Sequence, residues 1–198
     1  MGLDQFAGRS TPRRSDSRNT RLRLIEAVGD LVRTKGLEPR RLADVAEHAG
    51  VSVATAYRHF TSVDDVVRAH VVQLPERAAE LFDRNQRLEL TDADRFQRWN
   101  QAWVRACLDH GPSAVHLRST AGFLERRAHG DPVVAFVCRH VEPLLSAFDG
   151  DVLPLLVVWN VVSDPREVLD LHVTLKWSGQ RIARFITTTT LAARPSSR

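Results

Sequence analysis

Apolar side chains recur at intervals of three and four residues along most of this 198-residue chain. Such spacing places them on one face of an α-helix. The first clear stripe, between residues 17 and 35, comprises Leu22, Leu24, Ile25, Val28, Leu31 and Val32. Gly36 predicts where this helix ends. Because the same periodicity continues through the chain, we predict an all-α protein.

Residues 41–60, with the sequence RLADVAEHAGVSVATAYRHF, predict two short helices joined by a tight turn. In the first helix, expected over 42–49, the apolar side chains lie three and four positions apart. Gly50 can adopt the left-handed conformation that ends a helix, and Ser52 is suited to cap a second helix over 53–60. This spacing is typical of a helix-turn-helix, whose second helix enters the major groove of DNA.

The rest of the chain predicts further helices separated by short connections. Asp131-Pro132 and Asp164-Pro165 each place an N-cap residue before a proline at the first helical position. The segment VLPLLVVWNVV (152–162) would also suit a buried strand, but no second strand is available to pair with it, so we predict a helix. The expected helices are 62–74, 75–88, 92–110, 114–128 with a break near Gly122, 131–148, 152–162, 164–176 and 178–193.

The positive charge of the chain is concentrated near its N-terminus. The net charge is +4, and the first sixty residues hold eleven basic and seven acidic residues, which accounts for all of the excess. Six arginines and one acidic residue lie between Arg9 and Arg23. We expect residues 1–17 to form a flexible basic arm that lies along DNA phosphates or enters a minor groove. A disordered tail that only increases solubility explains this composition equally well.

The chain lacks the sequence motifs that are typical of several other classes of protein. No apolar run approaches the ~20 residues that span a bilayer, and the Arg/Ser-rich N-terminus has no apolar signal-peptide core, so we expect a cytoplasmic protein. The chain has no Gly-rich phosphate loop, HExxH motif, GxSxG motif or cysteine-rich zinc pattern, and its eight histidines are scattered. We therefore predict a protein that is not an enzyme and that binds no metal or cofactor.

Residues 21–70 resemble the DNA-binding domain of the TetR (tetracycline-repressor-like) family. The resemblance rests on the first apolar stripe and on motifs at fixed spacing, namely Gly36, Asp44-Val45-Ala46, Ala49-Gly50-Val51-Ser52, Tyr57-Arg58-His59-Phe60 and Ser62. It implies an N-terminal three-helix DNA-binding domain over 18–70 and a C-terminal helical ligand-binding and dimerisation domain over 71–198. Three residues depart from the family pattern: Arg41 at a helix cap that is usually Ser or Thr, Val63 at a usual lysine, and Ala56 at a usual branched residue.

The second helix of the predicted helix-turn-helix has few side chains that can form paired hydrogen bonds with a base. Its exposed N-terminal residues would touch thymine methyl groups, with one hydrogen bond from a threonine. We therefore expect phosphate contacts and DNA shape to contribute much of the binding. In the family the tyrosine and histidine of this helix contact phosphates. The predicted DNA contacts are Val53, Ala54, Thr55, Tyr57 and His59, with Arg40, Arg41 and Arg58 as cationic candidates.

The body of the chain, after residue 75, is rich in aromatic residues that would line an apolar pocket, although such residues are more often plain core. The candidate ligand contacts are Trp99, Trp103, Phe123, Phe136 and Trp159, with His116 and Asn160 as polar anchors. The resemblance also implies a homodimer formed by the last two helices, at about 164–193, that binds a near-palindrome in double-stranded DNA.

The sequence therefore predicts a ligand-responsive transcriptional regulator. Its most consistent form is a repressor that a small apolar or aromatic effector releases from DNA. The alternative is an architectural or constitutive DNA-binding protein that has no small-molecule ligand and whose body has no cavity.

Overall fold

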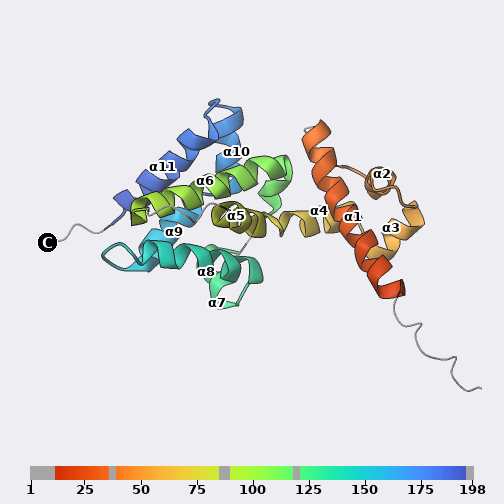
Figure 1. Cartoon of the computed structure of the whole chain (residues 1–198), viewed down its shortest axis with the longest axis horizontal. Helices are drawn as coiled ribbons and strands as arrows, with labels where there is room; N and C mark the ends of the chain where they lie inside the picture. The colour runs from red at the N-terminus through yellow and green to blue at the C-terminus, as the bar shows by residue number, and fades with distance from the viewer. Residues whose placement is uncertain (1–11, 36–38, 85–89, 118–120, 195–198) are drawn as a thin grey trace, which may run out of the picture.

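The computed structural model describes residues 12–35, 39–84, 90–117 and 121–194, with side chains from residue 16 onward. Every regular element in these ranges is a helix, as Figure 1 shows, which confirms the all-α prediction. The elements are α1 (Pro12–Lys35), α2 (Leu42–His48), α3 (Val53–His59), α4 (Val63–Val71), α5 (Leu74–Asp83), α6 (Asp92–His110), the 3-10 helix η1 (Gly111–Leu117), α7 (Phe123–Ala128), α8 (Pro132–Leu145), α9 (Val152–Val162), α10 (Pro165–Val173) and α11 (Gly179–Ala192). None of these helices is both long and apolar enough to cross a membrane.

The helices pack around two separate hydrophobic cores. The first core lies among α1, α2, α3 and α4, and it combines the apolar stripe of α1 with residues such as Val45, Ala56 and Phe60. The second and larger core lies among the later helices and includes Trp159 and Ile182. Figure 1 shows α1–α4 at one end of the molecule and the later helices at the other. We call these two parts the N-terminal unit (α1–α4) and the body (α5–α11 with η1).

Two glycines allow close approaches near the junction: Gly29 lets α1 approach α4 within the N-terminal unit, and Gly111 lets the body approach α1. A Cβ atom on Gly29 of α1 would lie 2.9 Å from Cε1 of His70, and a Cβ atom on Gly111 would lie 2.9 Å from Cγ1 of Val32. Gly111 also has a φ angle of +55°, which L-residues with a side chain rarely adopt. The junction therefore leaves no room for larger residues at these two positions.

Polar side chains cap the helices at the positions that the sequence predicts. Gly50 has a φ angle of +64°, and Oγ of Ser52 accepts a 3.1 Å hydrogen bond from the Thr55 amide. Asp131 and Asp164 accept hydrogen bonds from backbone amides in the first turns of α8 and α10. These caps satisfy amide groups that have no partner within the helix.

The segment 152–162 is a helix, α9, as predicted. The Asp151 carboxylate caps it by accepting a 3.0 Å hydrogen bond from the Leu153 amide. Leu155, Leu156 and Trp159 are buried in the core of the body. The β-branched composition does not produce a strand because the neighbouring elements in contact with α9 are the helices α8 and α11.

The boundaries of five predicted helices differ in the structure. Helices α4 and α10 end at Val71 and Val173, and not at residues 74 and 176. The first helix begins at Pro12, so residues 12–17 are helical and do not belong to a flexible arm, while residues 1–11 and Gly36 lie outside the described residues. Arginine has a good helix propensity, which lets α1 extend beyond its packed stripe. Helix α5 ends at Asp83, and part of its predicted extension to residue 88 lies outside the described residues. Helix α8 ends at Leu145 and not at residue 148.

In the structure, two shorter elements take the place of the single helix that was predicted over 114–128. Residues 111–117 form the 3-10 helix η1, and α7 begins only at Phe123. The positive φ angle of Gly111 stops α6, and Pro112 has no amide hydrogen with which to continue an α-helical pattern. The sequence placed a break near Gly122, which is the N-cap residue of α7.

Candidate functional site

The exposed face of α3 carries the residues that the sequence assigns to DNA. Val53 is 43% exposed and Tyr57 is 58% exposed, and Ala54 also faces solvent. On the opposite face Ala56 is fully buried in the core of the N-terminal unit, next to Phe60 at the end of the helix. The core therefore holds α3 by one face and leaves the other free to enter a groove.

A chain of hydrogen bonds runs along the exposed side of α3. The hydroxyl groups of Ser52 and Thr55 lie 2.8 Å apart, and Nη2 of Arg58 donates a 2.8 Å hydrogen bond to Oγ1 of Thr55. The Thr55 hydroxyl is therefore shared between its two neighbours. Arg58 lies along the helix and retains further N–H groups for another acceptor.

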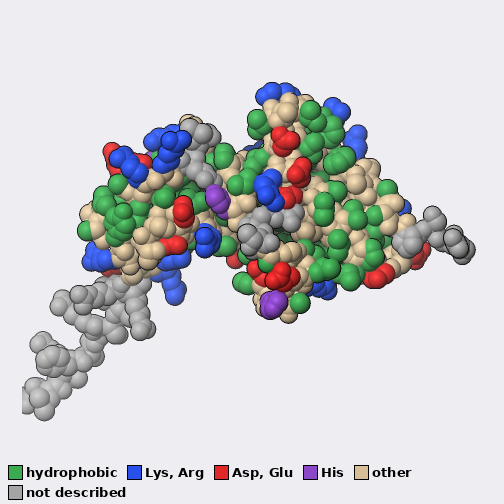
Figure 2. Space-filling model, turned by 180° about the vertical axis from the view of Figure 1, so that it is seen from behind, with side chains coloured by type: hydrophobic (Ala, Val, Ile, Leu, Met, Phe, Trp, Pro, Cys, Tyr) green, Lys and Arg blue, Asp and Glu red, His purple; other side chains and the backbone are tan. Residues whose placement is uncertain are grey.

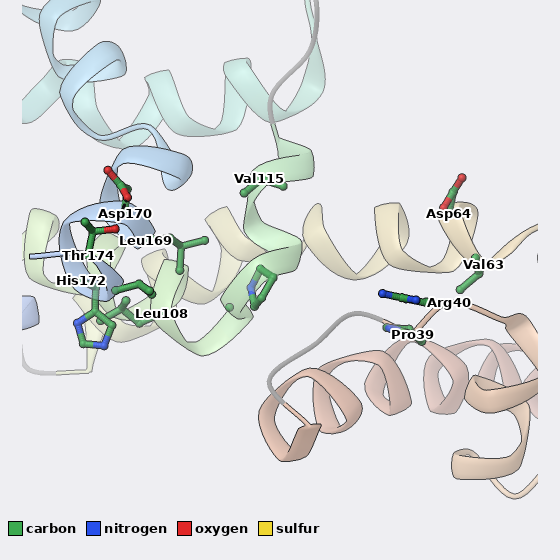
Figure 3. Close-up of a pocket in the computed structure, with 13 residues that line it drawn as sticks. Pro39, Arg40, Val63, Asp64, Leu108, Val115, Leu169, Asp170, His172 and Thr174 are labelled. Atoms are coloured by element: carbon green, nitrogen blue, oxygen red, sulfur yellow. Dashed lines mark hydrogen bonds between the residues drawn. The ribbon is translucent and has the colours of Figure 1, made fainter. Parts of the chain in front are cut away.

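The two arginines before α2 have different surroundings. Nη2 of Arg41 lies 2.5 Å from Oδ1 of Asp44, and this hydrogen bond lowers the pKa of the Asp44 carboxyl group. Arg41 occupies the N-cap position of α2 but makes no side-chain cap there. Arg40 lines a cleft between the N-terminal unit and the body, and Figure 3 shows its guanidinium group directed across that cleft.

Two arginines of α1 support the helix-turn-helix, and the sequence analysis had only counted them among the basic residues near the N-terminus. Nη2 of Arg23 donates a 2.5 Å hydrogen bond to the carbonyl oxygen of Ala49 and lies 3.4 Å from that of Gly50. The guanidinium group of Arg21 lies 4.9 Å from the centre of the Phe60 ring. These contacts join residues 26 to 39 positions apart, so no local pattern in the sequence indicates them.

Basic side chains surround the end of the molecule that α1–α4 form. Figure 2 shows Lys and Arg side chains on several sides of this end, with some Asp and Glu side chains among them, and side chains of both charges over the body. This distribution agrees with the concentration of positive charge in the first sixty residues. It favours contact of the N-terminal unit with a polyanion.

Four of the seven predicted ligand contacts line one small cavity in the body: Trp103, Phe123, Trp159 and Asn160. Its volume is about 40 Å³, whereas ligand pockets measure roughly 300–1,000 Å³. The indole N–H of Trp103 donates a 2.8 Å hydrogen bond to the carbonyl oxygen of Ser163 at the cavity wall. In this conformation the cavity is too small for a ligand, which would have to displace its walls.

The sequence analysis missed two charged residues of this cavity, Arg126 and Asp164. The Arg126 guanidinium group donates hydrogen bonds of 3.0 and 3.2 Å to the two carboxylate oxygens of Asp131. Asp164 is buried, and its carboxylate also caps α10. Asp131 and Asp164 were both predicted as helix caps. The capping role gave no indication that either residue also lies at or near a cavity.

The other three predicted ligand contacts lie elsewhere. Trp99 and Phe136 pack against His140, with ring centroids 5.4 and 4.5 Å from that of the imidazole. Trp99 is fully buried, so this cluster is part of the core of the body. His116 is exposed on η1. The structure therefore does not bring these three residues to the cavity.

The last two helices expose apolar side chains. Val173 and Leu175, at the end of α10 and just after it, are 59% and 54% exposed, and Phe185 of α11 is 38% exposed. The Phe185 ring packs edge to face against Trp177, with 5.7 Å between centroids. Exposed apolar surface of this kind is typical of an interface with another chain.

No cluster of three or more His, Cys, Asp or Glu side chains that could hold a metal ion occurs in the described part of the chain. Burial lowers the pKa of His70 and of His110, whose rings stack on each other at the junction. The arrangement combines an exposed helix, α3, with basic groups on the same unit and a small cavity in the body, which suits recognition of another molecule.

Comparisons with known proteins agree with this arrangement. Residues 24–69 match the family model for bacterial regulatory proteins of the tetR family. The fold resembles a transcriptional regulator from Rhodococcus sp. Rha1, with a TM-score of 0.59 and 16% identity over 87% of this chain and 95% of that one. It also resembles a TetR family transcription regulator from Marinobacter aquaeolei VT8, with a TM-score of 0.55 and 16% identity over 93% and 98% of the two chains.

A third similar structure is the multidrug binding protein EbrR complexed with imidazole, with a TM-score of 0.54 and 19% identity over 90% of this chain and 96% of that one. The search of curated protein sequences found no match.

Proposed function

We propose that this chain, which belongs to the TetR family of bacterial regulatory proteins, binds a near-palindromic operator as a homodimer and releases it when a small molecule binds to the body. The family makes the chain a DNA-binding transcription regulator and not an enzyme. Our proposal adds five properties to this family role: the operator symmetry, the dimer, the effector, the role as repressor and a cytoplasmic location.

The observation that carries the proposal is the position of α3. Its buried face is fixed by Ala56 in the core of the N-terminal unit, and its exposed face presents Val53, Ala54, Tyr57 and Arg58 to solvent. We assign the DNA contacts of α3 to this exposed face, with Arg40 and Arg41, before α2, as further cationic candidates. Within the predicted domains, 18–70 would bind DNA and 71–198 would bind the effector and form the dimer.

A homodimer explains why the end of α10 and α11 expose apolar side chains. One helix-turn-helix contacts too little DNA for tight, specific binding, whereas a two-fold dimer contacts two half-sites about one helical turn apart. Phe185→Glu should therefore shift the protein toward monomers in sedimentation experiments. Ala135→Glu, on the exposed side of α8, is the control and should leave the dimer intact.

Selection of bound sequences from a pool of random DNA duplexes tests the DNA-binding proposal directly. At physiological salt we expect enrichment of a near-palindrome. The double variant Tyr57→Ala/Arg58→Ala should lose this enrichment, because it removes two side chains from the exposed face of α3. Binding without any sequence preference, which phosphate contacts alone can produce, would contradict a specific regulator.

The small volume of the body cavity favours a second candidate function, that of a constitutive regulator without a ligand. A thermal-shift screen with apolar, aromatic and cationic compounds separates the two. An effector should stabilise the wild-type chain and weaken its binding to the selected operator. It should have no effect on Val133→Phe, whose larger side chain occupies the cavity. If no compound both stabilises the wild-type chain and weakens its binding to the operator, the chain is better described as a constitutive regulator.

A further inference from the structure

A cleft of about 980 Å³ lies between the N-terminal unit and the body. One side consists of the residues before α2 and the start of α4, and the other consists of the end of α6, η1 and α10 (Figure 3). It shares no lining residue with the small cavity of the body. Its volume is at the upper end of the range for small-molecule sites.

The wall of the cleft on the body side is apolar. Leu108 and Leu169 are only partly buried and pack against the core of the body. Val63 faces them from α4, where it packs against the core of the N-terminal unit. A ligand with an apolar part would therefore remove side chains of both cores from water, at roughly 25 cal/mol for each Å² of apolar surface.

The charge that faces this wall is positive. Figure 3 shows the guanidinium group of Arg40 directed across the cleft, with the Asp64 carboxylate directed away from it. Arg40 forms no ion pair with any residue that the structure describes. On the body side, the Asp170 carboxylate accepts a 2.6 Å hydrogen bond from Thr174. Among the residues that line the cleft, Arg40 is thus a cationic group that no described carboxylate pairs with, whereas Asp170 keeps its negative charge on the body side.

We propose that this cleft binds an amphipathic organic anion, whose acidic group pairs with Arg40 and whose apolar part packs against Leu108 and Leu169. A guanidinium group can hold a carboxylate or sulfonate through two parallel hydrogen bonds. Since the ligand contacts both the N-terminal unit and the body, its binding depends on their relative orientation. It would also draw Arg40 away from DNA phosphates; this last consequence rests on the proposed function, whereas the binding itself does not.

Two fluorescent probes with the same aromatic body test the proposal. 8-Anilino-1-naphthalenesulfonate carries a sulfonate, and N-phenyl-1-naphthylamine lacks it. We expect the sulfonate to bind the wild-type chain with one saturable site and about tenfold more tightly than the uncharged probe, since only the sulfonate can form charge-assisted hydrogen bonds with Arg40. The preference should decrease at high salt because Arg40 is exposed.

Substitutions at the cleft test whether the probes bind there. Arg40→Gln should remove most of the preference for the sulfonate and leave the affinity of the uncharged probe unchanged. Arg139→Gln, on the exposed side of α8, is the matched control and should behave as the wild type. Val115→Trp fills the cleft and should abolish binding of both probes, and circular dichroism must show that this variant is folded.

Three results would overturn the proposal. The first is equal affinity of the two probes for the wild-type chain. The second is an Arg40→Gln variant that behaves like Arg139→Gln. The third is loss of probe binding when the chain dimerises, which would mean that a second copy occupies the cleft. All these measurements are made without DNA. Failure to find an operator would therefore contradict the proposed function but not the proposed anion site.

Discussion

The imidazole rings of His70 and His110 stack on each other at the junction between the N-terminal unit and the body, with 4.5 Å between their centroids. Both residues are 6% exposed. Burial, with the nearby charges of His110 and Arg33, lowers the pKa of His70 to about 4, and burial also lowers the pKa of His110. Neither ring nitrogen of His70 has a hydrogen-bond partner within the described structure. The stack therefore requires both rings to be neutral.

Acidification should destabilise the folded chain through this pair. The pKa of His70 is about 4 in the folded chain and 6.5 in the unfolded chain, so the unfolded chain binds the proton more tightly. Stability is therefore full above pH 6.5 and decreases as the pH falls toward 4. Asp109 of α6 opposes part of this effect at His110. We expect a loss of about 2 kcal/mol from His70 by about pH 5, measured by urea unfolding across a pH series.

The variant His70→Phe keeps a ring in the stack but cannot be protonated. Its unfolding free energy should depend less on pH than that of the wild type. His129→Gln, which changes an exposed histidine of α7, should retain the pH dependence of the wild type. An equally steep loss of stability in His70→Phe would show that other groups cause the effect.

Arg58 should determine the preference for one base pair of the operator. It is the residue on the exposed face of α3 whose side chain can form two hydrogen bonds with a guanine, once it leaves Thr55. Arg58→Ala should cost about 1–3 kcal/mol on the selected operator and relax the preference at one position of each half-site. The comparison is Arg139→Ala, which should retain the full preference in the same selection.

Tyr57 should contact a phosphate and not a base, as the family resemblance implies, through the hydroxyl group of a side chain that is 58% exposed. Tyr57→Phe removes only the hydroxyl group. We expect weaker binding to every DNA sequence by a similar factor, with the base preference of the operator retained. Affinities measured for operator and unrelated DNA test this, and a loss confined to the operator would instead indicate a base contact.

Asn100 should be essential for the stability of the body. It connects α6 to two other helices: its Oδ1 accepts a 2.8 Å hydrogen bond from Nε1 of Trp159, and its Nδ2 donates a 2.9 Å hydrogen bond to Oγ1 of Thr187. Asn100→Ala should lower the free energy of unfolding by about 2–4 kcal/mol, because it leaves buried polar groups without partners. Gln101→Ala, at the exposed neighbouring position, should change it by less than about 0.5 kcal/mol.

Local interactions explain which parts of the fold could be predicted. The caps at Ser52, Asp131 and Asp164 each bond to an amide two or three residues along the chain, and Gly50 ends α2 through its own φ angle. Residues so close in sequence carry the information about such contacts themselves. The ambiguous segment 152–162 was also resolved correctly, because no partner strand existed for it.

The helix-turn-helix and the exposed face of α3 were determined by the sequence alone, since both depend on residue types at short, fixed spacing. Only the tertiary structure decided which distant residues meet. It directed Arg40 into a cleft, brought Arg23 to Ala49, and separated Trp99 and Phe136 from the cavity that contains Trp103 and Trp159. The physical reason is that a helical period specifies which face of each helix is apolar, whereas the contacts between helices depend on how those faces pack together in space.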